Sequence, residues 1–163
     1  MEKKEIIISY SVYQQSDELD VVEADMVKSA IEAVESSYSP YSKFAVGAAV
    51  RLANGKIIKG SNQENGAYPS GLCAERIAIF AAASQYPGVA MESISITAKT
   101  EGKSQDGPVV PCGACRQVMI EYENLQNSPM QIILHGESDK CFVINNAASL
   151  LPLSFSGDFL KKK

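Results

Sequence analysis

The segment PCGACRQ, residues 111–117, decides the fold of this 163-residue chain together with CAER, residues 73–76. Cys112 and Cys115 are three residues apart at the predicted start of a helix, so both sulfur atoms would point to one side of its first turn. Cys73 stands at the predicted start of another helix and can supply a third thiolate. The rest of the chain can then be understood as the scaffold that brings these two helix starts together.

Three cysteine thiolates are a donor set typical of a catalytic zinc site. Zn²⁺ binds thiolates in tetrahedral geometry, and three protein ligands leave the fourth position to water. The partial positive charge and free N–H groups at a helix start stabilise thiolates. Arg76 and Arg116 adjoin the two motifs and could offset the remaining negative charge by hydrogen bonding to sulfur. We therefore expect one zinc ion per chain, held by Cys73, Cys112 and Cys115.

A carboxylate stands beside the first of these cysteines. Glu75 is two residues from Cys73, which places its side chain near the metal without making it a ligand. A carboxylate beside a zinc-bound water can accept a proton from the water and pass it on, first as a general base and then as a general acid. Glu75 is therefore the candidate catalytic residue of a hydrolytic enzyme.

Other interpretations of the cysteines stay open at this point. A Cys-x-x-Cys pair can be a redox pair, although a thioredoxin-like context is missing here. A structural zinc site with four cysteines would need Cys141, which lies in an apolar, strand-like segment and is favoured as a small core residue. His135, the one histidine of the chain, has no ligand spacing to the cysteines, which favours a structural role.

Composition and charge limit the classes of protein to be considered. The length is that of one globular domain. The net charge of −4 argues against a nucleic-acid partner, which usually requires a clustered basic face, and the only basic run is residues 161–163. Residues 1–13 contain no apolar run long enough for a signal peptide or a membrane span. We therefore expect a cytoplasmic protein without a membrane partner, in a reducing compartment where cysteines serve metals or catalysis.

Helical and strand-like segments alternate along the chain, which indicates an α/β layer fold. Asp17 or Asp20 can cap the first helix, and Pro40 ends it. The expected helices cover residues 19–38, 73–86 and 112–124, with a last helical turn over 146–151. The expected strands cover residues 44–53, 56–62, 93–98, 131–135 and 141–144, the first two joined as a hairpin by an Asn-Gly turn. Residues 5–13 are rich in β-forming side chains without an identifiable partner, and residues 99–107 are expected to form a surface loop.

The pattern Cys-Ala-Glu followed by Pro-Cys-x-x-Cys resembles the signature of the zinc-dependent nucleoside and nucleobase deaminases. Most of the chain is similar to the short, homotetrameric cytidine deaminases, and relatives that act on free bases or nucleic acids typically carry histidine in place of Cys73. The resemblance implies a three-layer α/β/α sandwich with a mixed five-stranded sheet. It also implies a deaminase domain over residues 19–163, preceded by an N-terminal extension over residues 1–18.

Three further segments support the resemblance and imply contacts with the substrate. YSKFAVGAA resembles a segment whose phenylalanine lines the base pocket, here Phe44. NQEN resembles a segment whose asparagine and glutamate bond a ribose hydroxyl, here Asn62 and Glu64. LLPLSF resembles a C-terminal segment whose phenylalanine, here Phe155, reaches into a neighbouring subunit's site and stacks on the base. Backbone groups near Ala74 would hold the pyrimidine edge.

The chain also departs from the family pattern at two places. Residues 66–71, GAYPSG, differ from the more common A-S-Y-G loop and contain Tyr68. The segment between Cys73 and Cys112, which includes the loop over residues 99–107, is a few residues longer than usual. The resemblance therefore guides neither the role of Tyr68 nor the conformation of that loop.

The motifs and the resemblance together predict hydrolytic deamination of cytidine and 2′-deoxycytidine to the uridine products and ammonia, as in pyrimidine salvage. Glu75 would protonate N3 of the base while hydroxide attacks C4, in a homotetramer with shared active sites. Free cytosine should be a poor substrate, because a site that hydrogen-bonds a hydroxyl rejects a substrate lacking it. Two alternatives are a deaminase of a modified cytosine nucleoside such as blasticidin S and a non-catalytic zinc-binding domain.

Overall fold

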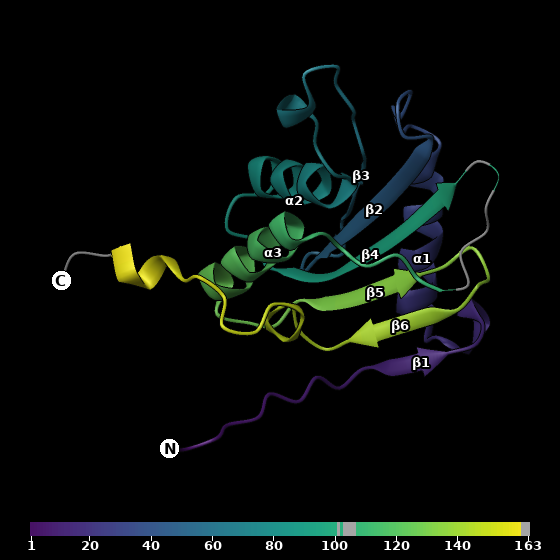
Figure 1. Cartoon of the computed structure of the whole chain (residues 1–163). Coiled ribbons are helices and arrows are strands. Elements are labelled where there is room, and N and C mark those ends of the chain that lie inside the picture. The colour runs from purple at the N-terminus through teal and green to yellow at the C-terminus, as the bar shows by residue number, and fades with distance from the viewer. Residues whose placement is uncertain (101, 103–106, 161–163) are drawn as a thin grey trace.

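The computed structural model describes residues 1–100, 102 and 107–160. A mixed sheet forms its middle layer, with α1 (Val21–Val34) on one face and α2 (Ala74–Gln85) and α3 (Gly113–Gln126) on the other (Figure 1). The predicted three-layer α/β/α architecture is thereby confirmed. Most of the predicted loop over residues 99–107 and the basic run at 161–163 lie outside the described residues.

The sheet has six strands in the order β1-β6-β5-β4-β2-β3. Neighbouring strands are antiparallel except β4 and β5, which run parallel, so the sheet is mixed as expected. The strands are β1 (Ser11–Tyr13), β2 (Phe44–Leu52), β3 (Ile57–Ser61), β4 (Met91–Thr100), β5 (Gln131–His135) and β6 (Cys141–Ile144). The strand β4 runs through Thr100, so the first two residues of the expected loop belong to the sheet.

The strand β1 makes six strands where five were expected, and it comes from the N-terminal extension. Val12 stands opposite Phe142 of β6, and the rings of Tyr10 and Phe142 lie 5.1 Å apart. Tyr13 packs against the core cluster beneath α1. The extension is thus packed onto the sheet, and its separation from the catalytic domain at residue 18 stays a prediction.

The first helix is set by its cap. The backbone N–H of Glu23 donates to Asp20 Oδ1 at 2.8 Å, and the Glu23 carboxylate accepts from the Asp20 N–H, a reciprocal capping box. The helix ends at Val34 and not at residue 38, because the next residues form tight turns and Tyr38 then pairs with the chain after β3. This pairing brings the end of α1 beside the residues that follow β3.

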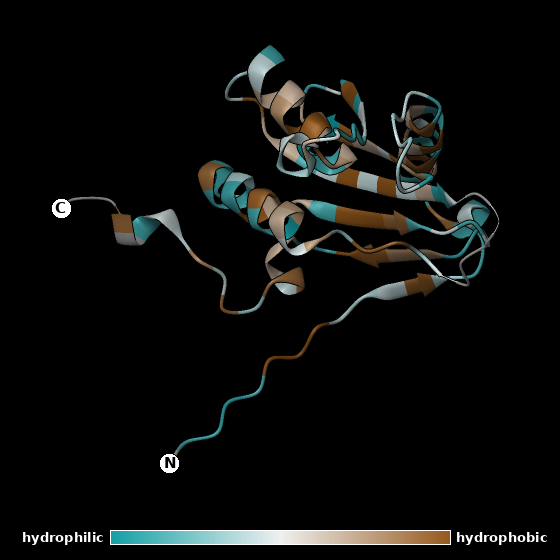
Figure 2. Ribbon diagram, turned by 45° about the horizontal axis from the view of Figure 1, so that its top comes forward, coloured by the Kyte–Doolittle hydropathy of each residue, from teal (hydrophilic) through white to brown (hydrophobic). Residues whose placement is uncertain are grey.

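Apolar side chains fill both spaces between the sheet and the helices. Every second residue of β2, from Val46 to Leu52, is buried beneath α2 and α3, as the alternation predicts. Cys141 is fully buried on the other face with α1, and burial raises the pKa of its thiol to about 11. Figure 2 shows hydrophobic residues along the central strands and an exposed hydrophobic stretch in the N-terminal segment, where Ile6, Ile7 and Ile8 lie.

The helix α2 lies directly on β3 at a glycine. A Cβ atom added to Gly60 would stand 2.5 Å from the backbone nitrogen of Ala78 and 2.7 Å from the carbonyl oxygen of Ala74. Both contacts are with backbone atoms of α2, which cannot turn away as a side chain can. Gly60 therefore fixes how closely the helix that carries Cys73 and Glu75 approaches the sheet.

We expect Gly60→Ala to lower the free energy of unfolding by about 1–3 kcal/mol or more, because overpacking forces α2 away from β3. Gly113→Ala is the matched control, since a Cβ atom there meets nothing within 4 Å. Chemical denaturation of both variants measures the difference. Equal stabilities would show that α2 can shift at no cost.

The C-terminal part of the chain is irregular. The predicted last turn is present as a short 3₁₀ helix, η3 (Ala148–Leu150), and a second one, η4 (Gly157–Leu160), was not predicted. None of the helices in the described part of the chain has the length and apolar character that a membrane crossing requires.

Candidate active site

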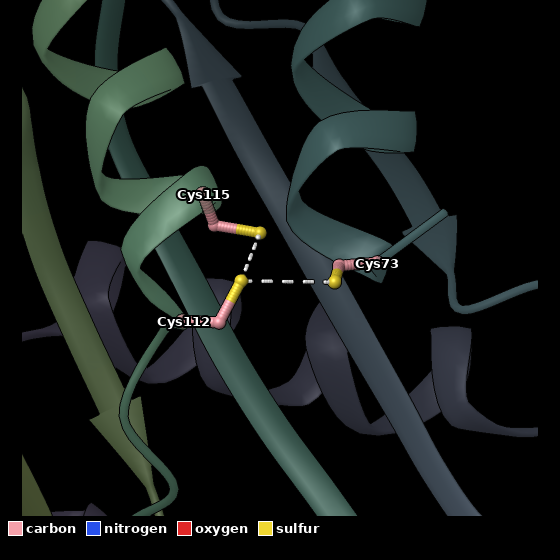
Figure 3. A group of neighbouring side chains, drawn as sticks. All are labelled: Cys73, Cys112 and Cys115. Carbon is pink, nitrogen blue, oxygen red and sulfur yellow. Dashed lines mark hydrogen bonds between the residues drawn. The ribbon is translucent and has the colours of Figure 1, made fainter. Parts of the chain in front are cut away.

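Three cysteine side chains from two helix starts meet at one point (Figure 3). Cys73 caps α2, Cys112 caps α3, and Cys115 lies in the first turn of α3. The Sγ atom of Cys112 lies 3.5 Å from that of Cys115 and 3.9 Å from that of Cys73, and all three sulfur atoms lie within 4.8 Å of one another. The fold therefore brings together the three residues expected to bind zinc.

The sulfur positions fit a tetrahedral metal ion. Two thiolates bound at about 2.3 Å at the tetrahedral angle stand about 3.8 Å apart, close to both observed separations. Within the described residues, no fourth cysteine, histidine or carboxylate joins this group. Cys141 lies on the opposite face of the sheet, so the alternative four-cysteine site does not form. The donor set leaves one tetrahedral position for water or substrate.

Hydrogen bonds prepare one of the thiols for metal binding. The neighbouring Cys115 thiol, helped by the Arg76 guanidinium, lowers the pKa of Cys73 to about 5. Arg76 Nη2 lies 3.8 Å from Cys73 Sγ, and this contact raises the pKa of Arg76. The neighbouring Cys73, together with burial, raises the pKa of Cys115. A metal ion bound here would therefore displace the remaining thiol protons.

Arg116 does not make the sulfur contact predicted for it. Its Nε donates to the carbonyl oxygen of Pro111 and its Nη1 donates to that of Leu150, both at 2.8 Å. The side chain starts on the first turn of α3 but turns toward the chain that enters the helix. Of the two expected arginines, Arg76 is the one with a hydrogen bond to sulfur in the described residues.

Glu75 lies in the first turn of α2 and is 4% exposed, yet it lines the cavity beside the cysteines. Burial raises the pKa of its carboxyl group, and the negative charge of Cys73 adds to the effect. A raised pKa makes the carboxylate a stronger base toward a neighbouring water. The position and the pKa thus suit Glu75 for proton transfer.

A cavity of about 770 Å³ opens beside Cys73, Cys112 and Glu75. Phe44 and Asn62, predicted to contact substrate, line it. Glu64, the third such residue, lines it as well. The other two predicted contacts do not: Ala74 is fully buried, and Phe155 is 58% exposed elsewhere on the chain.

Asn62 and Glu64 are held in the cavity wall mainly by backbone groups at and just before β2. Asn62 Oδ1 accepts from the Val46 N–H at 2.8 Å and from Ser37 Oγ at 2.5 Å, and Asn62 Nδ2 donates to the Phe44 carbonyl at 2.9 Å. These bonds leave the second amide hydrogen of Asn62 to a ligand. Glu64 accepts from two backbone N–H groups of residues 41–42, and its hydrogen bond with the Ser42 side chain lowers the pKa of its carboxyl group. Glu64 is therefore an ionised acceptor.

Several cavity residues were not predicted. Tyr41 and Tyr68 meet edge to face, with ring centroids 6.1 Å apart, and both line the cavity. Val109 and Val110 form an apolar wall opposite. The valines directly precede Pro111, and residues that lead into a metal-binding turn commonly face its ligand, so their position was the available signal.

His135 takes a structural place. It is 8% exposed, and its ring nitrogens lie 2.8 Å from Thr97 Oγ1 and 3.1 Å from Asp139 Oδ1. Asp139 Oδ2 in turn accepts from the backbone N–H of Ser16 in the N-terminal extension. The histidine thus links three segments of the fold and lines neither the cavity nor the cysteine group.

Three thiols spaced for a tetrahedral metal, with a buried carboxyl group in the same cavity, define a zinc-dependent hydrolytic site. The chain belongs to the cytidine and deoxycytidylate deaminase family: the family model described as "Cytidine and deoxycytidylate deaminase zinc-binding region" matches residues 22–128. The protein is accordingly a zinc-dependent deaminase, and the predicted family and cofactor are confirmed.

Individual relatives agree with the family model. A cytidine deaminase of Sporosarcina psychrophila is 41% identical over 136 residues, which are 83% of this chain and 92% of the relative. One of Halalkalibacterium halodurans is 46% identical over 96 residues, 59% of this chain and 68% of the relative. The crystal structure of cytidine deaminase from Burkholderia pseudomallei superposes with a TM-score of 0.70 at 37% identity, covering 80% of this chain and 97% of that one.

Proposed function

We propose that this enzyme deaminates cytidine and 2′-deoxycytidine by hydrolysis, giving uridine and 2′-deoxyuridine with release of ammonia, a reaction of pyrimidine salvage. The observation that carries the proposal is the placement of Glu75 in one cavity with Cys73 and Cys112. The two relatives at 41% and 46% identity, both cytidine deaminases, support the same reaction.

In this mechanism Glu75 moves protons within the cavity. Zinc held by Cys73, Cys112 and Cys115 would activate a water molecule for attack on C4 of the base. The Glu75 carboxylate accepts a proton from that water and delivers it to N3 of the ring. It then takes the proton of the hydroxyl group now on C4 and passes it to the amino group, so that the C4–N bond breaks, ammonia leaves and the C4 carbonyl forms. Burial suits Glu75 to these steps, because the raised pKa of its carboxyl group makes the carboxylate a stronger base.

The remaining cavity residues would orient the nucleoside. Phe44 would pack on the pyrimidine, and backbone groups near Ala74 would hold its polar edge. The free amide hydrogen of Asn62 and the ionised carboxylate of Glu64 suit the hydroxyl groups of the sugar, which both donate and accept. Asn62 is 9% exposed, so a sugar that fails to bond it would leave a buried donor unpaired.

The charges of the cavity favour a nucleoside over a nucleotide. Arg76 is the only cationic residue among the described residues that line the cavity, and its guanidinium bonds Cys73 Sγ. A 5′-phosphate would enter a cavity lined by two carboxylates, Glu64 and Glu75, in which the one cationic residue of the described lining, Arg76, lies at the thiols. This observation supports cytidine over deoxycytidylate as the substrate, while a modified cytosine nucleoside such as blasticidin S remains the alternative.

We further propose a homotetramer with shared active sites, in the cytoplasm. Phe155 would stack on the base in the cavity of a neighbouring chain. Its exposure, and that of Leu153, which is 94% exposed, support this role, since neither lines the cavity of its own chain. The cytoplasmic location rests on the sequence alone.

Turnover of four compounds, cytidine, free cytosine, deoxycytidine and deoxycytidylate, tests the proposal. We expect kcat/KM for free cytosine to be about 10⁴-fold below that for cytidine, because the sugar contacts of Asn62 and Glu64 are lost. Deoxycytidylate should also react more slowly than deoxycytidine. Loss of cytidine absorbance and release of ammonia are the measurements. Equal turnover of deoxycytidylate and deoxycytidine would contradict the nucleoside assignment, and no turnover of cytidine would favour a modified nucleoside or a non-catalytic domain.

A further inference from the structure

The C-terminal segment, residues 147–160, is attached to α3 at its start by one buried carboxylate. Glu123 is 8% exposed, and its two carboxylate oxygens accept from the backbone N–H groups of Ala147 at 3.0 Å and Ala148 at 2.9 Å. A third N–H, that of Met130 before β5, donates to the same carboxylate at 2.8 Å. The origin of the segment is therefore fixed to both α3 and the sheet.

A second attachment point leads to the metal-binding turn. One guanidinium group, that of Arg116, donates to the carbonyl of Leu150 and to the carbonyl of Pro111, which immediately precedes Cys112. The planar fork of an arginine holds two acceptors in a fixed relation, which a lysine amine on a flexible stem does not. Arg116 thus connects the turn that presents the thiols with the C-terminal segment.

The third attachment point reaches the aromatic residue itself. Gln117 Nε2 donates to the backbone carbonyl of Phe155 at 3.0 Å. Between the second and the third attachment points the chain makes an exposed turn, in which Leu153 has a positive φ of 57°. The placement of this turn therefore depends on its two ends, Leu150 and Phe155, and both ends are held by the residues that follow Cys115.

We infer that Arg116 and Gln117 are positioning residues that set the place of Phe155 for the active site of a neighbouring chain. The inference rests on the proposed function, in which Phe155 acts in a neighbour's cavity. Through these two side chains, the turn that holds Cys112 and Cys115 in one subunit also fixes the aromatic group offered to the next. Neither side chain bonds a sulfur atom in the described residues, so their effect is on the C-terminal segment.

Subunit mixing separates this role from a general structural one. Phe155→Ala chains keep Glu75 and the thiols but lack the aromatic group, and Glu75→Ala chains offer Phe155 without being able to catalyse. Assemblies of the two, isolated through two different affinity tags after co-expression, should regain activity. When the inactive partner also carries Arg116→Lys, the regained kcat/KM should fall to about one tenth or less of the value without that substitution. Small misplacements of a substrate-positioning group are costly. Arg51→Lys, on the surface of β2, replaces Arg116→Lys in the control.

The result is decisive because the altered Arg116 stands on a chain that performs no chemistry. Equal recovery with and without Arg116→Lys would overturn the inference. No recovery with either partner would also overturn it, while activity of the unmodified enzyme on cytidine would leave the proposed function standing.

A second measurement does not need activity. Hydrogen exchange of the backbone amides at residues 149–155 should be faster in Arg116→Lys and in Gln117→Ala than in the unmodified protein, with zinc content unchanged. Unchanged exchange in both variants would overturn the inference, even for an enzyme whose substrate proved to be different from cytidine.

Discussion

Replacing Glu75 with alanine is expected to lower kcat for cytidine by at least about 10³-fold while zinc stays bound at one ion per chain. The loss follows from the proposed role of the carboxylate, because the other carboxylate that lines the described cavity, Glu64, is bonded to the backbone N–H groups of Tyr41 and Ser42. The metal should remain because the three sulfur atoms complete the donor set without Glu75.

The Glu75→Ala variant should lose activity without losing stability. Burial raises the pKa of Glu75 in the folded protein above its pKa in the unfolded chain. Once the pH exceeds the pKa of the unfolded chain, the ionised carboxylate therefore lowers the stability of the folded state. Alanine removes that unfavourable charge at pH 7, and the side chain it replaces faces a cavity that water can enter. The melting temperature should therefore stay equal or rise.

The conservative variant Glu75→Gln serves as the matched control. Glutamine fills the same space but cannot accept a proton, so its kcat should be as low as that of Glu75→Ala. Absorbance at the cytidine band gives kcat, and metal analysis gives the zinc content of the same samples. Near-normal activity in either variant would assign the proton transfers to another group, and parallel loss of zinc would make Glu75 a ligand.

The sequence predicted the metal-binding group well because local spacing determines it. Cys112 and Cys115 share a helix turn whatever the rest of the chain does, and Glu75 is close to Cys73 for the same reason. The strands β5 and β6 were also predicted with their observed bounds, since each is a short apolar segment between clear turns. Features that depend on neighbours close in sequence could thus be predicted from the sequence.

What the sequence did not predict depends on pairing between distant segments. The partner of Arg116 is the carbonyl of Leu150, 34 positions away, and a backbone acceptor leaves no mark in the sequence. The pairing of β1 with β6 likewise requires knowing which edge of the sheet is open. Tyr68 reaches the cavity because the chain between β3 and α2 brings its ring beside that of Tyr41.

Replacing Cys112 with alanine should remove zinc, activity and part of the stability together. Cys112 Sγ lies between the other two sulfur atoms, at 3.5 Å and 3.9 Å, so its loss leaves two thiols without a common partner. Because zinc binds the folded chain, its loss removes the stabilisation that binding supplies, about 4 kcal/mol when zinc exceeds its Kd a thousandfold. Metal analysis and thermal unfolding of the purified variant measure both effects.

A chelator and a second cysteine variant make the assignment specific. Chelation should lower the melting temperature of the unmodified protein but leave that of Cys112→Ala unchanged, since that variant has no zinc to lose. Cys141→Ala is the matched control: it removes a buried thiol on the opposite face of the sheet, so zinc content and the response to chelator should both persist. Stoichiometric zinc in Cys112→Ala would refute the assigned ligands. Loss of zinc from Cys141→Ala would instead support the alternative four-cysteine site, in which Cys141 is a ligand. Each variant deletes one cysteine sulfur, the exposed Cys112 in one and the buried Cys141 in the other, so zinc content and the response to chelator, and not stability alone, separate the zinc site from cysteine loss in general.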